Sequence, residues 1–228
     1  MGVTTEPDST DGAARSVEIE VKFDVAADTP LPDWSALPGV ASMGEPERRD
    51  LDALYFDTAG LTLSHAGYAV RRRTGGPDEG WHIKGPRVGD GRIELHWPLG
   101  QSDDIPEGVR AALASVMDAL GASAEGALDP ESSALTPIAR IQNTRTAYAL
   151  RDQDGGLVAE FVDDRVVAND ERAGVERRWR EWELELGPAA PLAPEDRTAF
   201  FATADDAVRA AGGRIAASDS KLARALGV

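Results

Sequence analysis

The chain has 228 residues, no cysteine and a formal net charge of −16. Its hydrophobic content of 42% can fill a core, but no apolar run reaches the roughly 18 residues of a membrane span. The charge argues against nucleic acids and anionic membranes as partners, because both are polyanions. The absence of cysteine excludes disulfides and thiolate metal sites. We therefore expect a cytoplasmic protein whose metal ions, where it binds any, have oxygen or histidine ligands.

Residues 1–16 are small, polar and unpatterned, which predicts a disordered leader before a single domain of residues 17–228. Alternation of apolar and polar residues then predicts about eight strands with short turns between them. They lie at 17–23, around 53–57, and at 68–74, 80–85, 92–99, 139–150, 157–168 and 176–187. Helical spacing predicts helices at 107–121, 194–212 and within 218–227. The predicted fold is α+β: a closed, eight-stranded antiparallel β-barrel with the helices packed outside.

Charged side chains share one face of most predicted strands, and both signs occur. The acidic faces carry Glu18 and Glu20 with Lys22, and Glu181, Glu183 and Glu185; the basic ones carry Arg71 with Arg73, His82 with Lys84, and Arg92 with Glu94 and His96. A charged face ordinarily meets water, yet three glutamates in a row repel one another unless cations lie nearby. A closed sheet would instead turn these faces into a tunnel, with carboxylates suited to Mg²⁺ and basic groups suited to phosphate oxygens. The pattern alone leaves both arrangements open.

A set of short motifs in fixed order resembles the CYTH superfamily, also called triphosphate tunnel metalloenzymes. The motifs are ExExK (18–22), LYFDT (54–58), VRRRT (70–74), WHIKGP (81–86), the pair Arg140 and Arg145, VDDR (162–165), EWELEL (181–186) and SKLARAL (220–226). The resemblance covers nearly all of residues 17–228. It implies an eight-stranded tunnel that binds a triphosphate group and hydrolyses or cyclises it with Mg²⁺ or Mn²⁺.

The resemblance also implies roles for individual residues. The implied metal ligands are Glu18, Glu20, Glu94, Asp163, Glu181, Glu183 and Glu185. The implied substrate-binding residues are Lys22, Arg71, Arg73, Lys84, Arg92, Arg140, Arg145, Arg165 and Lys221, and the implied catalytic residues are Glu18, Glu20, Lys22 and Lys84. Two points stay open: the odd separation of Arg140 and Arg145 cannot place both on one face of a regular strand, and the neighbouring Asp164 leaves the register of Asp163 open by one residue.

The expected function is metal-dependent hydrolysis of inorganic triphosphate, because the tunnel motifs are complete and no aromatic-rich insertion stands out as a site for a base or a thiazolium ring. Two alternatives stay open: an enzyme of organic triphosphates (a thiamine or nucleoside triphosphatase, or an adenylate cyclase) and a non-catalytic module that binds polyphosphate. The expected partners are triphosphate or short polyphosphate and a helical, CHAD-like polyphosphate-binding domain outside this chain. A monomer or a homodimer is expected. The three histidines, at 65, 82 and 96, are scattered and are expected to be structural.

Overall fold

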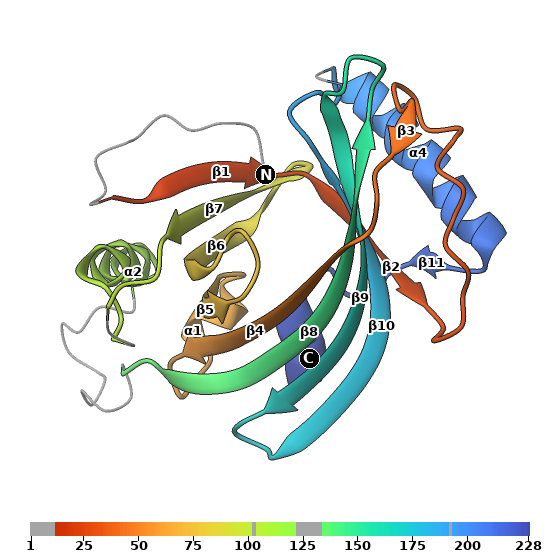
Figure 1. Cartoon of the computed structure of the whole chain (residues 1–228). Coiled ribbons are helices and arrows are strands. Elements are labelled where there is room, and N and C mark those ends of the chain that lie inside the picture. Colours follow the sequence, from red (N-terminus) through yellow and green to blue (C-terminus); the bar gives the residue numbers. More distant parts are fainter. Residues whose placement is uncertain (1–11, 102–103, 122–133, 192) are drawn as a thin grey trace.

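The computed structural model of the chain describes residues 12–101, 104–121, 134–191 and 193–228. Most of it is one curved antiparallel sheet, shown in Figure 1. The strands are β1 (Ala14–Glu18), β2 (Glu20–Val25), β3 (Ser42–Met43), β4 (Glu47–Asp57), β5 (Ala69–Thr74), β6 (Gly80–Val88), β7 (Gly91–Trp97), β8 (Thr136–Arg151), β9 (Leu157–Asp170), β10 (Val175–Leu186) and β11 (Arg214–Ile215). The helices of the described residues are α1 (Thr62–His65), α2 (Glu107–Ala119), α4 (Pro194–Ala211) and α5 (Lys221–Leu226).

The antiparallel strands and the few helices agree with the prediction, but the closed eight-stranded barrel was wrong. The sheet is open and 11-stranded, with the order β1-β7-β6-β5-β4-β8-β9-β10-β2-β11, and β3 pairs with β8. The reason lies in the N-terminal segment, which breaks at Ile19 into two strands. Its first half pairs with β7 and its second half pairs with β10, so one short segment contributes to both sides of the sheet. The alternation predicted the strand but not the change of neighbour within it.

Only the last residues of the predicted leader lie in the described part of the chain. Residues 1–11 lie outside the described residues, and residues 14–16 already belong to β1, where they pair with residues 94–96 of β7. Among the residues that the structure describes, no helix is long and apolar enough to cross a membrane.

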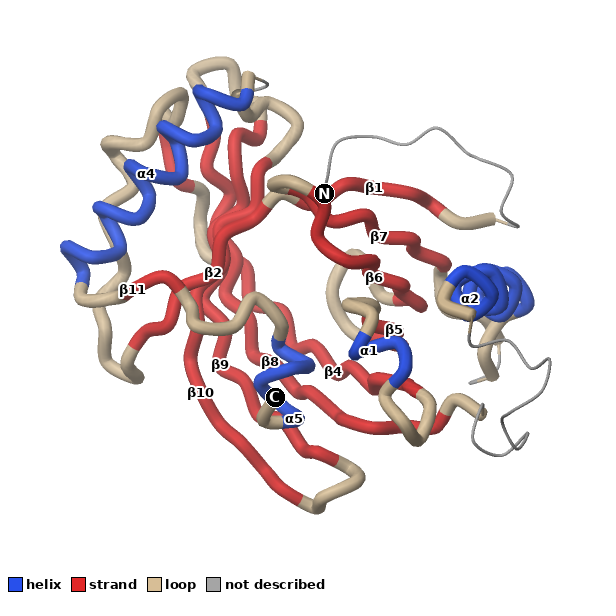
Figure 2. The backbone as a smooth tube through the Cα atoms, turned by 180° about the vertical axis from the view of Figure 1, so that it is seen from behind, coloured by secondary structure: helices blue, strands red, loops and turns tan. Residues whose placement is uncertain are grey.

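Two helices cover the convex outer face of the sheet, as Figure 2 shows for α4 and α2. Helix α4 begins at Pro194 with acidic residues in its first turn, and it ends at Gly212, whose left-handed backbone suits glycine. Its Phe200 packs in a buried cluster with Phe161 and Trp182 of the sheet. A second cluster joins α2 to the outer face of β5, β6 and β7. The apolar faces of the strands are therefore covered, and the opposite faces turn inward.

Helix α5 lies on the inner face, contrary to the prediction that all helices pack outside. Its Leu222, Ala225 and Leu226 form a buried cluster with inner-face residues of β4, β8 and β9, and Figure 2 shows it lying over these strands. Ser220 caps the helix by accepting a hydrogen bond from the backbone nitrogen of Ala223 at 3.2 Å. One end of the concave face is therefore apolar and filled, and α5 brings Lys221 to the border of the charged part.

Candidate active site

The inner face of the sheet surrounds a charged cavity. Its charged lining residues are Glu18, Glu20, Lys22, Arg71, Arg73, Asp78, Lys84, Arg92, Arg145, Glu183, Glu185, Asp219 and Lys221. Ion pairs that join neighbouring strands take up much of the interior. The cavity has a volume of about 100 Å³. The charged faces of the strands therefore line an interior cavity and are not turned to bulk solvent.

A first acidic group lies where β2, the end of β1 and β10 meet. Glu20 and Glu185 are direct partners across the ladder between β2 and β10, and Glu18 lines the same cavity. Glu18 bonds Lys84 at 2.6 Å and Glu20 bonds Lys22 at 2.9 Å, whereas Glu185 has no ion pair with any described residue. Burial, together with the charges of Glu18 and Glu20, raises the pKa of Glu185 to about 7. This group carries more negative charge than its neighbours neutralise.

The oxygen atoms of this first group suit a divalent metal. Burial raises the pKa of Glu18 even though Lys84 acts to lower it, so adding a further cation would relieve both Glu18 and Glu185. Mg²⁺ and Mn²⁺ take carboxylate oxygens as ligands. Glu18, Glu20 and Glu185 are therefore the carboxylates whose charge a metal would best balance, whereas the carboxylates whose oxygens converge within 4.8 Å among the described residues are Asp164, Glu181 and Glu183.

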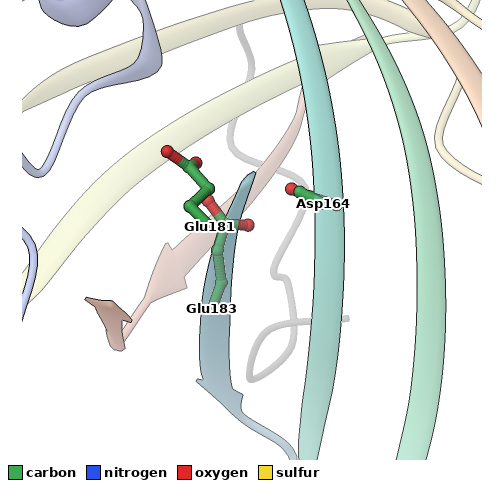
Figure 3. Close-up of side chains that lie close together, drawn as sticks. All are labelled: Asp164, Glu181 and Glu183. Carbon is green, nitrogen blue, oxygen red and sulfur yellow. The ribbon is translucent and has the colours of Figure 1, made fainter. Parts of the chain in front are cut away.

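A second acidic group consists of Asp164 on β9 and Glu181 and Glu183 on β10, shown in Figure 3. All three are buried, and one oxygen of each lies within 4.8 Å of the others. Cations already contact them: Arg145 bonds both oxygens of Asp164 at 2.8 and 2.7 Å, and Lys221 lies among all three carboxylates. Although burial acts to raise it, the pKa of Asp164 is lowered by Arg145 and Lys221. This group is charged and internally paired.

The basic side chains come from β5, β6, β7 and β8. Burial, together with the nearby cations Arg71 and Arg145, lowers the pKa of Arg73 to about 9, so positive charge is concentrated here. The buried Nε atoms of Arg71, Arg73 and Arg92 have no hydrogen-bond partner among the described residues. Buried donors that lack acceptors are costly unless an anion receives them. Guanidinium groups match phosphate oxygens in both charge and shape.

Glu94 faces inward but binds cations of the protein. It accepts from His82 Nδ1 at 2.7 Å and from Arg71 Nη2 at 3.5 Å, and Lys84 Nζ lies 3.7 Å away. Although burial acts to raise it, Lys84 and other neighbours lower the pKa of Glu94 to about 2. Glu94 does not line the cavity itself, so its contacts fit a residue that positions Lys84 and Arg71 better than a metal ligand. His82 is buried and hydrogen-bonded, as expected of a structural histidine.

Three predicted site residues, Arg140, Asp163 and Arg165, point to the outer face. Arg140 is half exposed and bonds Asp52 at 2.6 Å, and Asp163 bonds Arg180 at 2.7 Å. Residues one or five positions apart on a strand face opposite sides. Because Asp164 and Arg145 turn inward, the side chains of Asp163, Arg165 and Arg140 must turn outward. These predictions were wrong, and the open register is settled in favour of Asp164.

Sequence reasoning missed part of the lining on β4. The strand begins at Glu47, six residues before the prediction, and its inward residues include Arg49 and Tyr55. Arg49 bonds both oxygens of Glu160 at 3.0 Å, and Arg71 donates to the Tyr55 hydroxyl at 3.5 Å. The alternation of ERRDLDALY carries this signal. Its charged start resembles a loop, which is why the prediction placed the strand too late.

The chain is similar to known proteins along most of its length. A family model described as the CYTH domain matches residues 16–205. Two uncharacterized proteins of Mycobacterium tuberculosis, MT2285 of strain CDC 1551 and Rv2226 of strain H37Rv, are each 34% identical over 224 residues. The match covers 94% of this chain and 41% of each relative, so the chain spans less than half of their length.

Two solved structures share the fold. A protein from Bacillus halodurans, provisionally named an adenylate cyclase, superposes with a TM-score of 0.58 at 17% identity, covering 92% of this chain and 97% of that one. The PH1819 protein of Pyrococcus horikoshii OT3 gives a TM-score of 0.51 at 16% identity, covering 92% and 98%. The family match spans most of the chain, including Glu18 at the end of β1 and all of β10. The protein belongs to the CYTH domain family, whose members are in general enzymes that act on triphosphates.

Proposed function

We propose that this protein hydrolyses inorganic triphosphate with the help of Mg²⁺ or Mn²⁺. The observation that carries the proposal is the pairing of two features in one cavity. The buried Nε donors of Arg71, Arg73 and Arg92 have no acceptor among the described residues, and the carboxylate of Glu185 lines the same cavity without an ion pair to any described residue. A metal-bound chain of phosphates would satisfy both at once.

The basic residues would bind and align the phosphates. Arg73 and Arg145 reach the cavity from β5 and β8, the two strands that flank β4, and Lys84 reaches it from β6. Because ion pairs already join these cations to carboxylates in the cavity, phosphate oxygens would replace carboxylates as their partners. Fixed cations stabilise the charge that shifts onto the oxygens as the P–O bond breaks, and such positioning accounts for most of the catalysis in phosphoryl transfer.

The carboxylates Glu18, Glu20 and Glu185 would hold the metal. The bound metal would neutralise phosphate oxygens and lower the pKa of the attacking water. Lys84 holds Glu18 at 2.6 Å and Lys22 holds Glu20 at 2.9 Å. Both carboxylates line the cavity beside a lysine.

The proposal includes partners and setting. Triphosphate or a short polyphosphate is the substrate, and the surplus of acidic residues outside the cavity disfavours long polyanions such as nucleic acids. Some longer proteins would carry a helical polyphosphate-binding domain beside this one. That domain would supply or hold the substrate. Monomer and homodimer both remain compatible with an active site built within one chain.

The test is phosphate release from tripolyphosphate, ATP and thiamine triphosphate, each with Mg²⁺, with Mn²⁺ and with a chelator. We expect the fastest release from tripolyphosphate, and none with the chelator. Lys84→Met should lower the rate by about 10²–10³-fold, since it removes a cation aimed at developing charge. Arg178→Met is the matched control, because Arg178 is exposed and pairs with Glu176.

Other outcomes would replace the proposal. Faster turnover of ATP or thiamine triphosphate would make the protein an enzyme of organic triphosphates. A rise in melting temperature with tripolyphosphate but no release of phosphate would make it a binding module.

A further inference from the structure

The ammonium of Lys221 occupies the position that a metal ion would take in the second acidic group. Its Nζ lies 2.9 Å from Asp164, 2.5 Å from Glu181 and 2.5 Å from Glu183. It donates a hydrogen bond to Glu183 and forms ion pairs with the other two carboxylates. Three buried carboxylates alone would not identify a cation site. The cation seated among them is a second observation, and it shows that the group holds a positive charge at its centre.

The carboxylates are held in place from behind by other donors. Arg145 bonds the oxygens of Asp164 at 2.8 and 2.7 Å and the Oε2 of Glu183 at 2.6 Å. Trp179 Nε1 donates to the Oε2 of Glu181 at 2.5 Å. Each glutamate therefore turns its Oε1 toward Lys221. Because these supports do not involve Lys221, the three converging oxygens should keep their places when its charge is removed.

Lys221 is the cation that contacts all three carboxylates of the group. Arg145, Lys22 and Arg224 each contact some of them, but Lys22 also pairs with Glu20 and Arg224 also pairs with Asp24. Without Lys221 the three buried carboxylates would lose the cation at their centre, which is strongly unfavourable. Two oxygens on opposite sides of a Mg²⁺ ion lie about 4 Å apart, so ligand atoms within 4.8 Å of one another would need only small shifts to hold a metal.

We propose that Lys221 is a built-in cation that keeps divalent metal out of this second group. The first group, Glu18, Glu20 and Glu185, then receives the metal on its own. The proposal rests on the proposed use of metal in this cavity, and it sets the number of metal ions that the cavity takes. It also gives Lys221 a role different from direct phosphate binding, because its ammonium lies in ion-pair contact with three carboxylates.

The test counts bound Mn²⁺ by electron paramagnetic resonance during titration of the metal-free protein, without any phosphate compound. Lys221→Met removes the charge and keeps most of the side-chain volume. We expect this variant to bind one more Mn²⁺ per chain than the original protein does. The metal should also raise its melting temperature more than it raises that of the original protein. A folded Lys221→Met variant with an unchanged number of bound ions would overturn the proposal.

A matched control separates the lost charge from a loosened helix. Leu226 lies on the same helix and packs in the buried cluster between α5 and the inner face of the sheet. Leu226→Ala should weaken the attachment of α5 without removing a charge, and it should leave the number of bound ions unchanged. An additional ion in this variant would show that opening of the helix, and not Lys221 itself, governs access, and would also overturn the proposal.

Two further variants keep the test decisive if Lys221→Met does not fold. In the protein with Lys221 intact, Glu181→Gln should leave Mn²⁺ binding unchanged, because no metal uses that carboxylate. Weaker Mn²⁺ binding by Glu181→Gln would overturn the proposal. Glu185→Gln should weaken Mn²⁺ binding. If Mn²⁺ binding is unchanged in this variant while the other variants behave as expected, the result counts against the proposed metal site and the proposed function. The two ideas can therefore fail separately.

Discussion

Glu185 and Glu20 are direct cross-strand partners, and both line the charged cavity. Like charges in this position destabilise a sheet unless a cation lies between them. Lys22 bonds Glu20 at 2.9 Å but not Glu185 among the contacts of the described residues. The unbalanced carboxylate is therefore Glu185, and the properties of the proposed metal site depend on it more than on any other residue.

Glu185→Gln should weaken binding of Mn²⁺ and lower hydrolysis by about 10²–10³-fold, because it removes a ligand charge from the site where charge develops. The fold should be kept, since the amide has the same shape and relieves a repulsion. Mn²⁺ titration and phosphate release measure the two effects. Glu176→Gln is the control, because Glu176 lies exposed on the same strand. Unchanged Mn²⁺ binding in Glu185→Gln would contradict the assignment of this ligand.

The acidity of Glu185 should make metal binding depend on pH near neutrality. Its pKa is raised to about 7 by burial and by Glu18 and Glu20, and a protonated carboxyl binds metal poorly. The affinity for Mn²⁺ should therefore fall about tenfold per pH unit as the pH drops below about 7. Titrations between pH 8 and 5 would show this, and Glu185→Gln should show a flatter profile.

The stability of the metal-free protein should follow the opposite trend. The folded protein binds the proton of Glu185 more tightly than the unfolded chain, whose glutamate titrates near 4.5. This contribution to the free energy of unfolding is full below about pH 4.5 and is lost as the pH rises through about 7. Subtracting the unfolding curves of Glu185→Gln from those of the original protein isolates it. A difference that does not change with pH would contradict the raised pKa.

Alternation predicted which charged side chains share a face of each strand, and the resemblance to a known family implied that this face turns inward. Glu18, Lys84 and Glu183 each lie where period two places them, and all line one cavity. The resemblance to a known family added the assignment of roles and is confirmed at the level of the family. Alternation works here because the outer face is apolar and covered by helices, so a slip of one residue would bury charge without partners.

The sequence did not predict features that depend on contacts between distant segments. The break at Ile19 follows from pairing with both β7 and β10, which local alternation cannot report. The inner position of α5 depends on apolar inner-face residues such as Ile141 and Val166. Choosing between Asp163 and Asp164 required the partners of each carboxylate. One bonds Arg180 on the outer face and the other bonds Arg145 on the inner face.

Arg140 and Arg145 provide a test of the two faces of one strand. Arg140→Met should leave hydrolysis unchanged and lower stability by about 0–1 kcal/mol, because its pair with Asp52 is half exposed. Arg145→Met should abolish most hydrolysis and cost about 3–5 kcal/mol, because Asp164 and Glu183 would lose a buried partner. Urea unfolding and phosphate release measure both. Equal effects of the two substitutions would contradict the outward position of Arg140.

Asp163 and Asp164 offer the sharpest comparison, because adjacent residues with the same side chain have separate roles. Asp163 bonds Arg180, which also donates to the backbone oxygens of Ala26 and Thr29. Asp163→Asn should therefore lower stability by about 3–5 kcal/mol, because it leaves the Arg180 charge buried without a partner. The rate of hydrolysis per folded molecule should not change.

Asp164→Asn should act on both properties. Arg145 and Lys221 both contact this carboxylate, so its loss moves cations that line the cavity, and misplacement of about 1 Å can cost about 10²-fold in rate. Hydrolysis measured below the melting temperature of each variant, and normalised to the folded fraction, separates the two cases. If Asp163→Asn lowered the normalised rate as much as Asp164→Asn, the two carboxylates would both serve the site, and the division into a structural outer face and an active inner face would be wrong.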